Sequence, residues 1–355
     1  MYRRHVVSLA ATFAAFLWLG GINPAFAEDY RISGPVVHEN LALYFIHGQS
    51  APGKAPLTLE EALAQNLVKV HETDDVNALA IENLGAADVF VQSGDLVKGG
   101  KQDRVLTVSL LLPAHSGRVS IAAFCVEQGR WSARGGEDAK TFGSAAALLY
   151  SHSAKLAMKA PRLTPSPTQH SSPVAVAGLD SAETGARQQE MWQSVKQAQD
   201  MLSRSVGAPV AAAQSRTSLQ LAYENEKLQA ARAGYVKALQ PAGEKDSDIV
   251  GYVFAINGKI NSADVYPSNS LFRKMWGKLL AANATEAIGD KNAAATPPPS
   301  PAAVRAFLDA AERGAASEKP LPVNGRLATR VAEQALYFET RRADGGWVHK
   351  NYLMK

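Results

Sequence analysis

The chain has 355 residues, of which 46% are hydrophobic and 20% are charged. These proportions match ordinary globular proteins, so they exclude a chain that is disordered throughout and a collagen-like chain. The formal net charge is only +4, which is too small to indicate a nucleic-acid partner. The chain has a single cysteine, Cys125, which rules out an internal disulfide framework.

The first 27 residues have the three parts of a secretory signal peptide. Arg3 and Arg4 precede the apolar run Val6–Leu19, and Ala25-Phe26-Ala27 forms a cleavage site of the small-x-small type. We therefore expect cleavage after Ala27 and a periplasmic or secreted protein, with the choice between Sec and twin-arginine export left open. Neither the apolar run nor any later segment reaches the ~20 residues that span a bilayer, so no membrane span is expected after cleavage.

Residues 28–159 have the pattern of a strand-rich section. Thr58 and Glu61 have the spacing of a capping box, and the apolar positions after them predict one helix whose face runs from Leu59 to Val70. Short apolar runs separated by turn residues predict strands at Leu41–His47, Ala78–Glu82, Val89–Gln92, Val105–Leu112 and Val119–Val126.

A Pro- and Ser-rich stretch at residues 160–188 predicts a long surface loop. Residues 189–355 then combine helices and hairpins, with turns at Asn257-Gly258 and Gly345-Gly346. Helical periodicity occurs at residues 191–202, 221–239, 271–280 and 302–313, and hairpin patterns occur at residues 249–266 and 335–353. Because strands and helices are segregated, the predicted class is α+β, a largely antiparallel sheet with segregated helices. We expect one integrated domain in which the later hairpins complete the fold, although the sequence leaves open whether the two halves fold independently.

One cluster of polar residues stands out in the strand-rich section. If Lys101–Leu106 and Ile121–Gln128 are strands that pair across the turn near residue 116, polar side chains meet at one end of a sheet. In chain order the cluster contains Gly99, Gly100, Lys101, Gln102, Arg104, Cys125, Glu127, Arg130 and Trp131.

Each member of this cluster has two interpretations. Gly99 and Gly100 are either backbone donors to a phosphate, helped by the neighbouring cations, or a hairpin loop. Arg104 interrupts an apolar strand pattern, so if it is buried we expect it to pair with Asp103, with Glu127 or with a ligand.

The remaining members are open to the same choice. Glu127 is a candidate general base or a member of an ion-pair network. Cys125 is a buried small hydrophobic residue or a nucleophile with His115 as its base. Trp131 is a cap on the core or a stacking platform for a base.

No metal site is predicted, and the sequence leaves any cofactor unknown. The histidines are scattered, and the chain contains neither paired cysteines nor a His-Glu-x-x-His motif. A Walker-type phosphate loop and a Gly-x-Ser-x-Gly elbow are also missing from the sequence.

Two short motifs carry a resemblance to a known family. Gly100-x-Gln102-x-Arg104 and Cys125-x-Glu127-x2-Arg130-Trp131 resemble the family named for its association with ADP-ribosylglycohydrolases and rhodanese–phosphatase proteins. The segments Gly251-Tyr252-Val253, Trp276-Gly277-Lys278-Leu279-Leu280 and Tyr337-Phe338-Glu339 are also similar to that family. The resemblance implies a link to NAD and ADP-ribose metabolism through gene neighbourhood, and it brings no established catalytic residues.

The sequence therefore supports two hypotheses. The first is a domain that binds, and in a stronger version hydrolyses, an anionic small molecule such as an ADP-ribose or nucleotide derivative. In this hypothesis Gln102 and Arg104 bind the ligand. Glu127 is the first candidate for a catalytic base, and Cys125 is a weaker candidate for a catalytic residue. The alternative is a non-enzymatic module that binds a protein or envelope component, in which the motif is a structural ion-pair network. Whether the protein is an enzyme is left open.

Overall fold

The computed structural model describes residues 30–160, 181–291 and 296–355. The predicted signal peptide and residues 161–180 of the predicted loop lie outside the described residues. The end of that predicted loop is helical, because helix α3 (Ser181–Val206) begins at Ser181. Its first turns are held by Arg187, which donates to the carbonyl of Ala160 (2.7 Å), and by Gln188, which donates to the carbonyl of Cys125 (2.8 Å).

An eight-stranded antiparallel sheet joins both ends of the described chain. Its strands lie in the order β1 (Arg31–His38), β2 (Leu41–His47), β12 (Ile249–Ile256), β13 (Lys259–Val265), β17 (Trp347–Met354), β16 (Ala335–Arg341), β15 (Arg326–Val331) and β14 (Ala315–Pro320). Because β2 pairs directly with β12, early and late segments of the chain form one sheet.

The other early strands form a closed six-stranded barrel. Its order is β10 (Gly117–Cys125), β5 (Ala78–Asn83), β4 (Val68–Glu72), β11 (Thr141–Leu148), β7 (Asp95–Gly99) and β8 (Arg104–Leu106). A small three-stranded sheet is formed by β3 (Leu57–Thr58), β6 (Val89–Val91) and β9 (Leu110–Leu112), which alternate in the sequence with the barrel strands.

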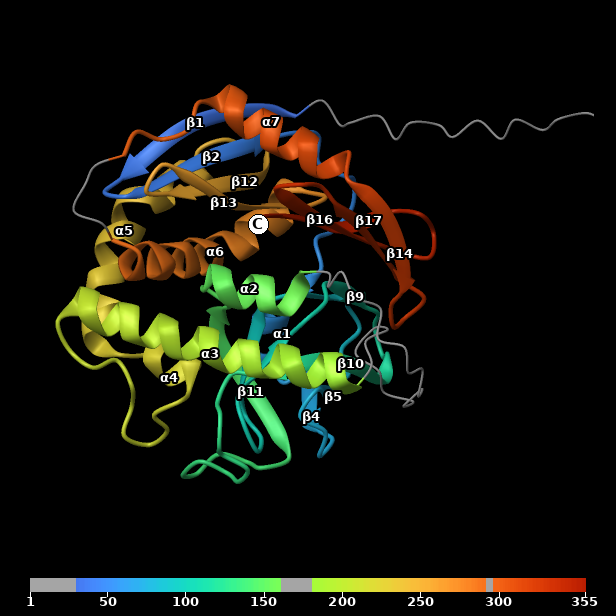
Figure 1. The fold of residues 1–355 in the computed structure, drawn as a ribbon. Coiled ribbons are helices and arrows are strands. Elements are labelled where there is room, and N and C mark those ends of the chain that lie inside the picture. The colour runs from blue at the N-terminus through green and yellow to red at the C-terminus, as the bar shows by residue number, and fades with distance from the viewer. Residues whose placement is uncertain (1–29, 161–180, 292–295) are drawn as a thin grey trace, which may run out of the picture.

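Helices cover the large sheet on both faces (Figure 1). Helix α7 (Pro301–Glu312) buries Val304 and Phe307 against the outer face, next to Tyr44. On the other face α6 (Asn269–Gly289) contacts both β12 and the barrel strand β11, so it joins the sheet to the barrel. The other helices of the described chain are α1 (Leu59–Ala64), α2 (His152–Lys159), α4 (Leu219–Tyr223) and α5 (Glu226–Glu244). None of the described helices has the length and apolar composition of a membrane span.

The structure confirms the predicted α+β class and several local predictions. Thr58 and Glu61 form the predicted capping box. Asn257 and Gly258 both have positive φ (50° and 73°), as the predicted hairpin turn requires. The helix predicted from the periodicity at residues 271–280 is present as part of α6, which is capped by Ser268.

Three predicted elements are wrong in extent. The helix predicted to reach Val70 ends at Ala64, because Asn66 has positive φ (56°) and turns the chain into β4. The predicted strand Val105–Leu112 is split between β8 and β9: the Thr107 amide still donates to Ala122 of β10 (3.1 Å), but its carbonyl accepts from the Ser93 hydroxyl (2.7 Å) instead of continuing the ladder. The helical pattern at residues 221–239 is divided between α4 and α5, because Asn225 caps a new helix.

Candidate functional site

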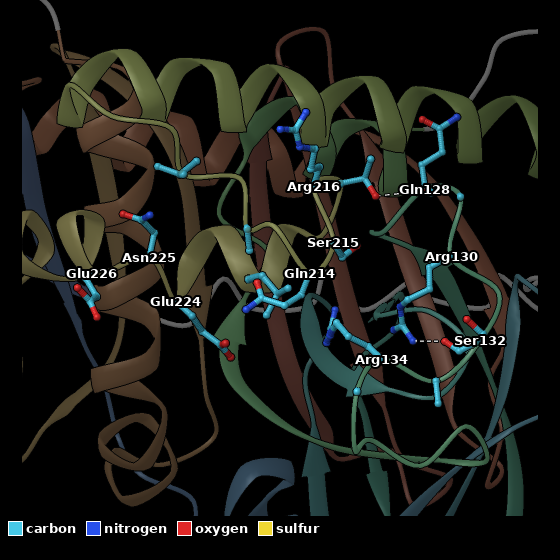
Figure 2. Close-up of a pocket in the computed structure, with 17 residues that line it drawn as sticks. Gln128, Arg130, Ser132, Arg134, Gln214, Ser215, Arg216, Glu224, Asn225 and Glu226 are labelled. Atoms are coloured by element: carbon cyan, nitrogen blue, oxygen red, sulfur yellow. Dashed lines mark hydrogen bonds between the residues drawn. The ribbon is translucent and has the colours of Figure 1, made fainter.

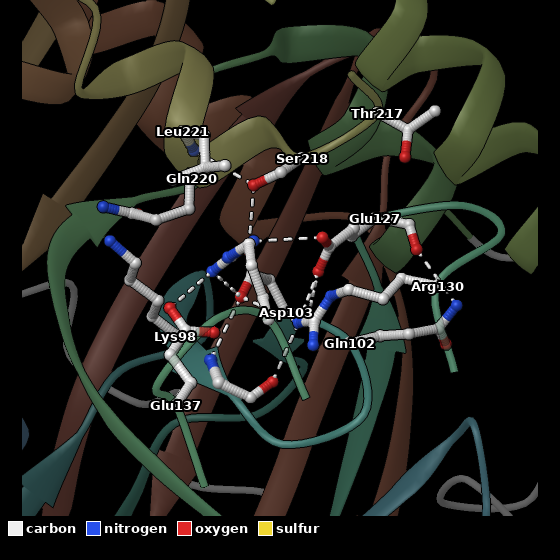
Figure 3. Close-up of polar contacts among 12 residues, drawn as sticks. Lys98, Gln102, Asp103, Glu127, Arg130, Glu137, Thr217, Ser218, Gln220 and Leu221 are labelled. Atoms are coloured by element: carbon white, nitrogen blue, oxygen red, sulfur yellow. Dashed lines mark hydrogen bonds and ion pairs between the residues drawn. The ribbon is translucent and has the colours of Figure 1, made fainter. Parts of the chain in front are cut away.

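The polar cluster meets at one end of the barrel. Strand β8 pairs with β10 in a register that places Arg104 opposite Cys125. The predicted pairing of these two segments is therefore confirmed, but the predicted strand from Lys101 is shorter, because residues 100–103 form the β7–β8 turn. The turn lies against the loop that follows β10, and the start of α4 closes the cluster from the other side (Figure 3).

Two buried carboxylates, Asp103 and Glu127, form the centre of an ion-pair network. Arg134 Nη1 donates to Asp103 Oδ2 (3.0 Å) and to Glu127 Oε1 (3.0 Å). Its Nη2 donates to Asp103 Oδ1 (3.1 Å) and to Glu137 Oε1 (2.9 Å). Ser218 at the start of α4 adds a hydroxyl donor to Asp103 Oδ2 (2.7 Å). Every Nη hydrogen of Arg134 therefore has a protein acceptor.

Arg130 ties the same network to the glycine turn. Its Nη2 donates to Glu127 Oε2 (2.7 Å) and to the Gly99 carbonyl (3.1 Å), and its Nη1 donates to the Gly100 carbonyl (3.0 Å). The Gly99 amide donates to Asp103 Oδ1 (3.1 Å), and the Gly100 amide donates to the Thr141 carbonyl (3.0 Å). Both glycine N–H groups, which we considered as phosphate donors, are thus used inside the protein.

Gln102 is also engaged within the network. Its Nε2 donates to the Glu127 carbonyl (3.0 Å), and the Gln102 carbonyl accepts from Arg104 Nη1 (2.8 Å). With a side chain that is almost fully buried, Gln102 supports Arg104 from within rather than facing an opening.

The two central carboxylates have pKa values that move in opposite directions. Burial raises the pKa of Glu127, but the hydrogen bonds from Arg130, Ser215 and the Asp103 amide, together with the charge of Arg130, hold the pKa below its usual value of 4.5. Burial, together with the nearby charge of Glu127, raises the pKa of Asp103 above its usual value despite Arg134. Glu127 is therefore ionised at neutral pH, but its two oxygens already accept hydrogen bonds from Arg130 and Arg134, as well as from the Asp103 amide.

Arg104 has two nitrogens without a hydrogen-bond partner, whereas Arg130 has one, its Nε. The Arg104 side chain has no exposed surface, yet neither Nε nor Nη2 has a hydrogen-bond partner. The predicted partners Asp103 and Glu127 do not pair with it. The nearest carboxylate is that of Glu72 on β4, with Oε2 3.7 Å from Nη2.

Glu72 is held by other groups. Its Oε2 accepts a hydrogen bond from the Lys101 amide (3.1 Å), and its Oε1 accepts one from the Thr73 amide (3.1 Å).

The unpaired donors of Arg104 share one edge of its guanidinium. Nε–H and Nη2–H point in parallel from this edge, which can bind a carboxylate or phosphate through two hydrogen bonds. On this edge Arg104 thus has two donors without a hydrogen-bond partner, although its side chain has no exposed surface.

Trp131 covers this end of the barrel. Its ring lies 5.8 Å from the guanidinium carbon of Arg104 and 4.9 Å from Lys101 Nζ. The Trp131 residue is 44% exposed, so one part of it faces solvent while another faces the two cations. Lys101 also forms an ion pair with Asp74.

Cys125 does not have the surroundings of a nucleophile. It is fully buried, and its Sγ donates to the Glu127 carbonyl (3.0 Å). Burial raises the pKa of the thiol above its usual value. His115, the base that we considered, precedes β10 while Cys125 ends it, a separation of roughly 26 Å along an extended strand. The predicted Cys–His arrangement does not form.

An open cleft of about 1200 Å³ lies beside the network. Arg130 and Arg134 are on one side of it, with Arg216 across from them and Glu224, Asn225 and Glu226 along another wall (Figure 2). Because the carboxylates behind Arg130 and Arg134 match their charges, the cleft has a mixed rather than a strongly positive lining.

Arg134 and Ser218 are the network members that sequence reasoning missed. Arg134 lies in the glycine-containing loop only four residues after Arg130, so the charge pattern there was a usable signal. Ser218 comes from a segment 115 residues away from Asp103, and no local pattern points to it.

One group of potential metal ligands occurs among the described residues, namely His47, Asp246 and Asp248. His47 Nδ1 lies 2.8 Å from Asp248 Oδ1 and its Nε2 lies 2.7 Å from the Ser33 hydroxyl. Arg31 also pairs with Asp248 (3.0 Å). Both ring nitrogens and one carboxylate are therefore engaged by protein groups, and we assign no metal to this position.

The fold and the site define an α+β protein in which a buried ion-pair network closes one end of a small barrel. The chain belongs to the family described as the ARG and Rhodanese-Phosphatase-superfamily-associated Protein domain, whose family model matches residues 29–353. The family name records an association with ADP-ribosylglycohydrolases and with the rhodanese–phosphatase superfamily. Searches of curated proteins and of solved structures find no match.

Proposed function

We propose that this protein binds an anionic small molecule at the end of the barrel, through the open edge of Arg104. The observation that carries the proposal is the fully buried guanidinium whose Nε and Nη2 have no protein acceptor. Most buried polar groups have a hydrogen-bond partner, so we expect a bound group to accept from the two unpaired donors of this guanidinium. An oxyanion with two oxygens, such as a phosphate or a carboxylate, matches this pair of donors.

Two neighbours suit a ligand that carries an aromatic base as well as an anionic group. Trp131 offers a partly exposed ring beside Arg104, and Lys101 adds a second cation near that ring. Aromatic side chains stack on bases with little preference for sequence. Together with the ADP-ribose association of the family, this favours an ADP-ribose or nucleotide derivative as the ligand.

The position of Glu127 favours simple binding of the ligand over its hydrolysis. A general base must reach the water that it activates, and Glu127 is fully buried with two arginines on its carboxylate. The stronger version of the hypothesis therefore requires the network to open. Cys125 has even less support as a catalytic residue, since it is buried with a raised pKa.

A second candidate function is favoured by the saturated network itself. If Asp103, Glu127, Arg130 and Arg134 serve only to hold loops in place, the protein is a non-enzymatic module that binds a protein or envelope component. In that case Arg104 needs no ligand, and a water molecule satisfies its open edge.

We further propose that the protein is exported. The support is the charged, apolar and small-residue pattern of residues 1–27. The test is the N-terminal sequence of the protein recovered from the periplasm or the medium. A mature protein that begins at Glu28 supports export, and one that keeps Met1 inside the cell contradicts it.

The binding proposal is tested by thermal unfolding with ADP-ribose, ADP, ribose 5-phosphate and inorganic phosphate at constant ionic strength. A ligand present at 100 times its Kd stabilises the protein by about 2.7 kcal/mol. We expect such a shift for the wild type and for Arg118→Lys, a control at an exposed arginine (68% exposed side chain) at the other end of β10. We expect its loss in Arg104→Lys, which keeps the charge but lacks the two-donor edge.

Trp131→Ala keeps the test valid if Arg104→Lys does not fold. Trp131 is partly exposed, so its truncation leaves the barrel intact while it removes the stacking surface. We expect weaker binding of ADP-ribose but retained binding of inorganic phosphate. Unchanged unfolding temperatures with every ligand, in a folded wild-type protein, would exclude the site and favour the interaction module.

A further inference from the structure

A small cavity lies away from the barrel end, between helices α2 and α6 and the strands β13 and β17. Its volume is about 40 Å³, which is enough for a molecule of about two or three heavy atoms. Helix α2 lies beside α6 in the layer between the sheet and the barrel (Figure 1). Lys155 and Lys159 contribute to one wall, and Asp264, Asn283 and Asn351 to the others.

The two lysines face the cavity one helical turn apart, but their partners differ. Lys155 Nζ pairs with the carboxylate of Glu286 (2.9 Å). Lys159 Nζ donates to the neutral amide oxygen of Asn351 (2.7 Å). In the described part of the chain no carboxylate forms an ion pair with Lys159.

These surroundings favour the neutral amine of Lys159. Burial lowers its pKa to about 8, with the charge of Lys155 lowering it further and that of Asp264 opposing the shift. A lysine that is desolvated next to another cation is a common way to obtain a nucleophilic amine. At pH 7 about one Lys159 in ten is then uncharged and able to attack an electrophile.

The opposite wall supplies groups that suit a carbonyl substrate. The carboxylate of Asp264 accepts the Asn351 amide (2.9 Å) and the Tyr252 hydroxyl (3.3 Å), and it lies 3.2 Å from His349 Nε2. Asn283 Nδ2 is buried without a hydrogen-bond partner. An unsatisfied amide donor beside a reactive amine is suited to hold a carbonyl oxygen.

We propose that Lys159 forms an imine with a small aldehyde bound in this cavity. The uncharged Nζ attacks the carbonyl carbon, and its two hydrogens leave with the carbonyl oxygen as water, so that a C=N bond replaces the C=O bond. The protons move from nitrogen to the carbonyl oxygen through water, and the negative charge of Asp264 stabilises the cationic intermediates without a proton transfer through the Asn351 amide. No oxidant or reductant is needed for this step.

The groups that set the pH dependence come from every wall. Lys155 and His152 lie on α2, Glu286 on α6, Asp264 on β13 and Tyr252 on β12, while His349 is on β17. Burial lowers the pKa of His152, so this residue is neutral above its usual pKa of 6.5. Asp264 is ionised over the same range, because His349 holds its pKa below the usual value against burial. The amine of Lys159 is therefore the group that titrates near pH 8.

The test is reductive trapping of the full-length protein with acetaldehyde and cyanoborohydride, followed by peptide mapping. We expect Lys159 to be alkylated at least about tenfold faster at pH 7 than Lys196, whose side chain is 78% exposed. The rate at Lys159 should reach half its maximum near pH 8. Equal labelling of the two lysines, or labelling of Lys159 that rises only above pH 10, would overturn the proposal.

A variant separates this chemistry from the binding site at the barrel. In Lys159→Met the fast phase of labelling should disappear, while the response to phosphate through Arg104 should remain. Persistence of the fast phase in Lys159→Met assigns it to another lysine and overturns the proposal. Because the peptide map of the wild type is decisive by itself, the test does not depend on the folding of the variant.

Discussion

The protein contains two buried polar clusters that differ in how completely their groups are satisfied. At the barrel end, Arg130 and Arg134 have a protein acceptor for each Nη hydrogen, and the central carboxylates of Asp103 and Glu127 accept at both oxygens. Among the described residues, only Arg130 Nε and Glu137 Oε2, at the rim of this network, are buried there without a partner. In the cavity beside α2, Asn283 Nδ2 has no partner and Lys159 has an amide in place of a counter-ion.

This difference separates a scaffold from a place where chemistry is favoured. A saturated ion-pair network loses stability when any member is removed, because the remaining charges are left buried. A cluster with unsatisfied donors and free volume keeps capacity for a ligand. Arg104 combines both features, since it borders the saturated network while its own Nε and Nη2 are open. Five predictions test this difference between the two clusters.

The largest effect is expected from Arg134→Ala. The change leaves Asp103 and Glu127 buried without one of their cations, which should lower the free energy of unfolding by about 3–5 kcal/mol. Urea unfolding measures it. As a control, Lys196→Ala breaks an exposed pair with Asp200 and should cost at most about 1 kcal/mol. Equal losses in the two variants would show that the network is not a scaffold.

Gly100→Ala should also be costly, because the network needs the backbone of this turn. An added Cβ would lie 2.2 Å from the ring of Phe142, and φ is +53°. Overpacking and backbone strain together should cost about 2–4 kcal/mol in urea unfolding. Gly135 has a similar φ of +58° with open space around its Cβ position, so Gly135→Ala isolates the backbone strain at about 1 kcal/mol. If the two variants are equally stable, Phe142 does not pack on the turn.

Glu127→Gln should give a pH-dependent loss. The pKa of Glu127 is below its usual 4.5 in the folded protein, so its ionised form stabilises the fold above pH 4.5 and this contribution disappears as the pH falls through the folded pKa. The variant should be less stable by about 1–3 kcal/mol at pH 7. The gap to the wild type should narrow towards pH 3.

The wild type must be measured beside Glu127→Gln, because Asp103 changes the stability with pH in the opposite direction to Glu127. Its pKa is raised, so its contribution is present at low pH and is lost as the pH rises through the folded pKa. Unfolding free energies of both proteins at several pH values measure the gap. A gap that stays constant from pH 7 to pH 3 would contradict the assignment to Glu127.

Asn283→Leu probes the unsatisfied cluster and should have a small effect. Because Asn283 Nδ2 makes no hydrogen bond, its replacement should change the free energy of unfolding by less than about 1 kcal/mol. Asn83 is the matched control, since this buried amide donates to the carbonyls of Ala87 (2.8 Å) and Pro113 (2.9 Å). Asn83→Leu should cost more than about 2 kcal/mol. A loss for Asn283→Leu as large as for Asn83→Leu would show that the cavity cluster is also saturated.

The smallest effect is expected at Cys125. Its thiol is fully buried and burial raises its pKa, so the native protein should not react with iodoacetamide at pH 7. Mass spectrometry should detect one carbamidomethyl group only after unfolding. Rapid reaction of the folded protein would restore Cys125 as a candidate nucleophile.

The predictable parts of the fold and site are those that depend on neighbouring residues. The capping box at Thr58 and the Asn257-Gly258 turn follow from side-chain and backbone geometry within four residues. The pairing of the Arg104 and Cys125 segments was also predicted from two successive apolar runs, although β9 lies between β8 and β10 in the chain. The start of the predicted Lys101–Leu106 strand was wrong. Gly100 turns the backbone there with a positive φ, and the turn packs on Phe142 and accepts a hydrogen bond from Arg130.

The sequence by itself therefore determined the α+β class, most of the local elements and the identity of the polar cluster. Only the tertiary structure decided what those polar groups do. Glu72 became the neighbour of Arg104 through barrel closure, Ser218 reached Asp103 from 115 residues away, and Lys159 came to face Asp264 when α2 packed on the sheet. Burial and unmet hydrogen bonds arise from such long-range packing, and they are the properties that separate a scaffold from a reactive site.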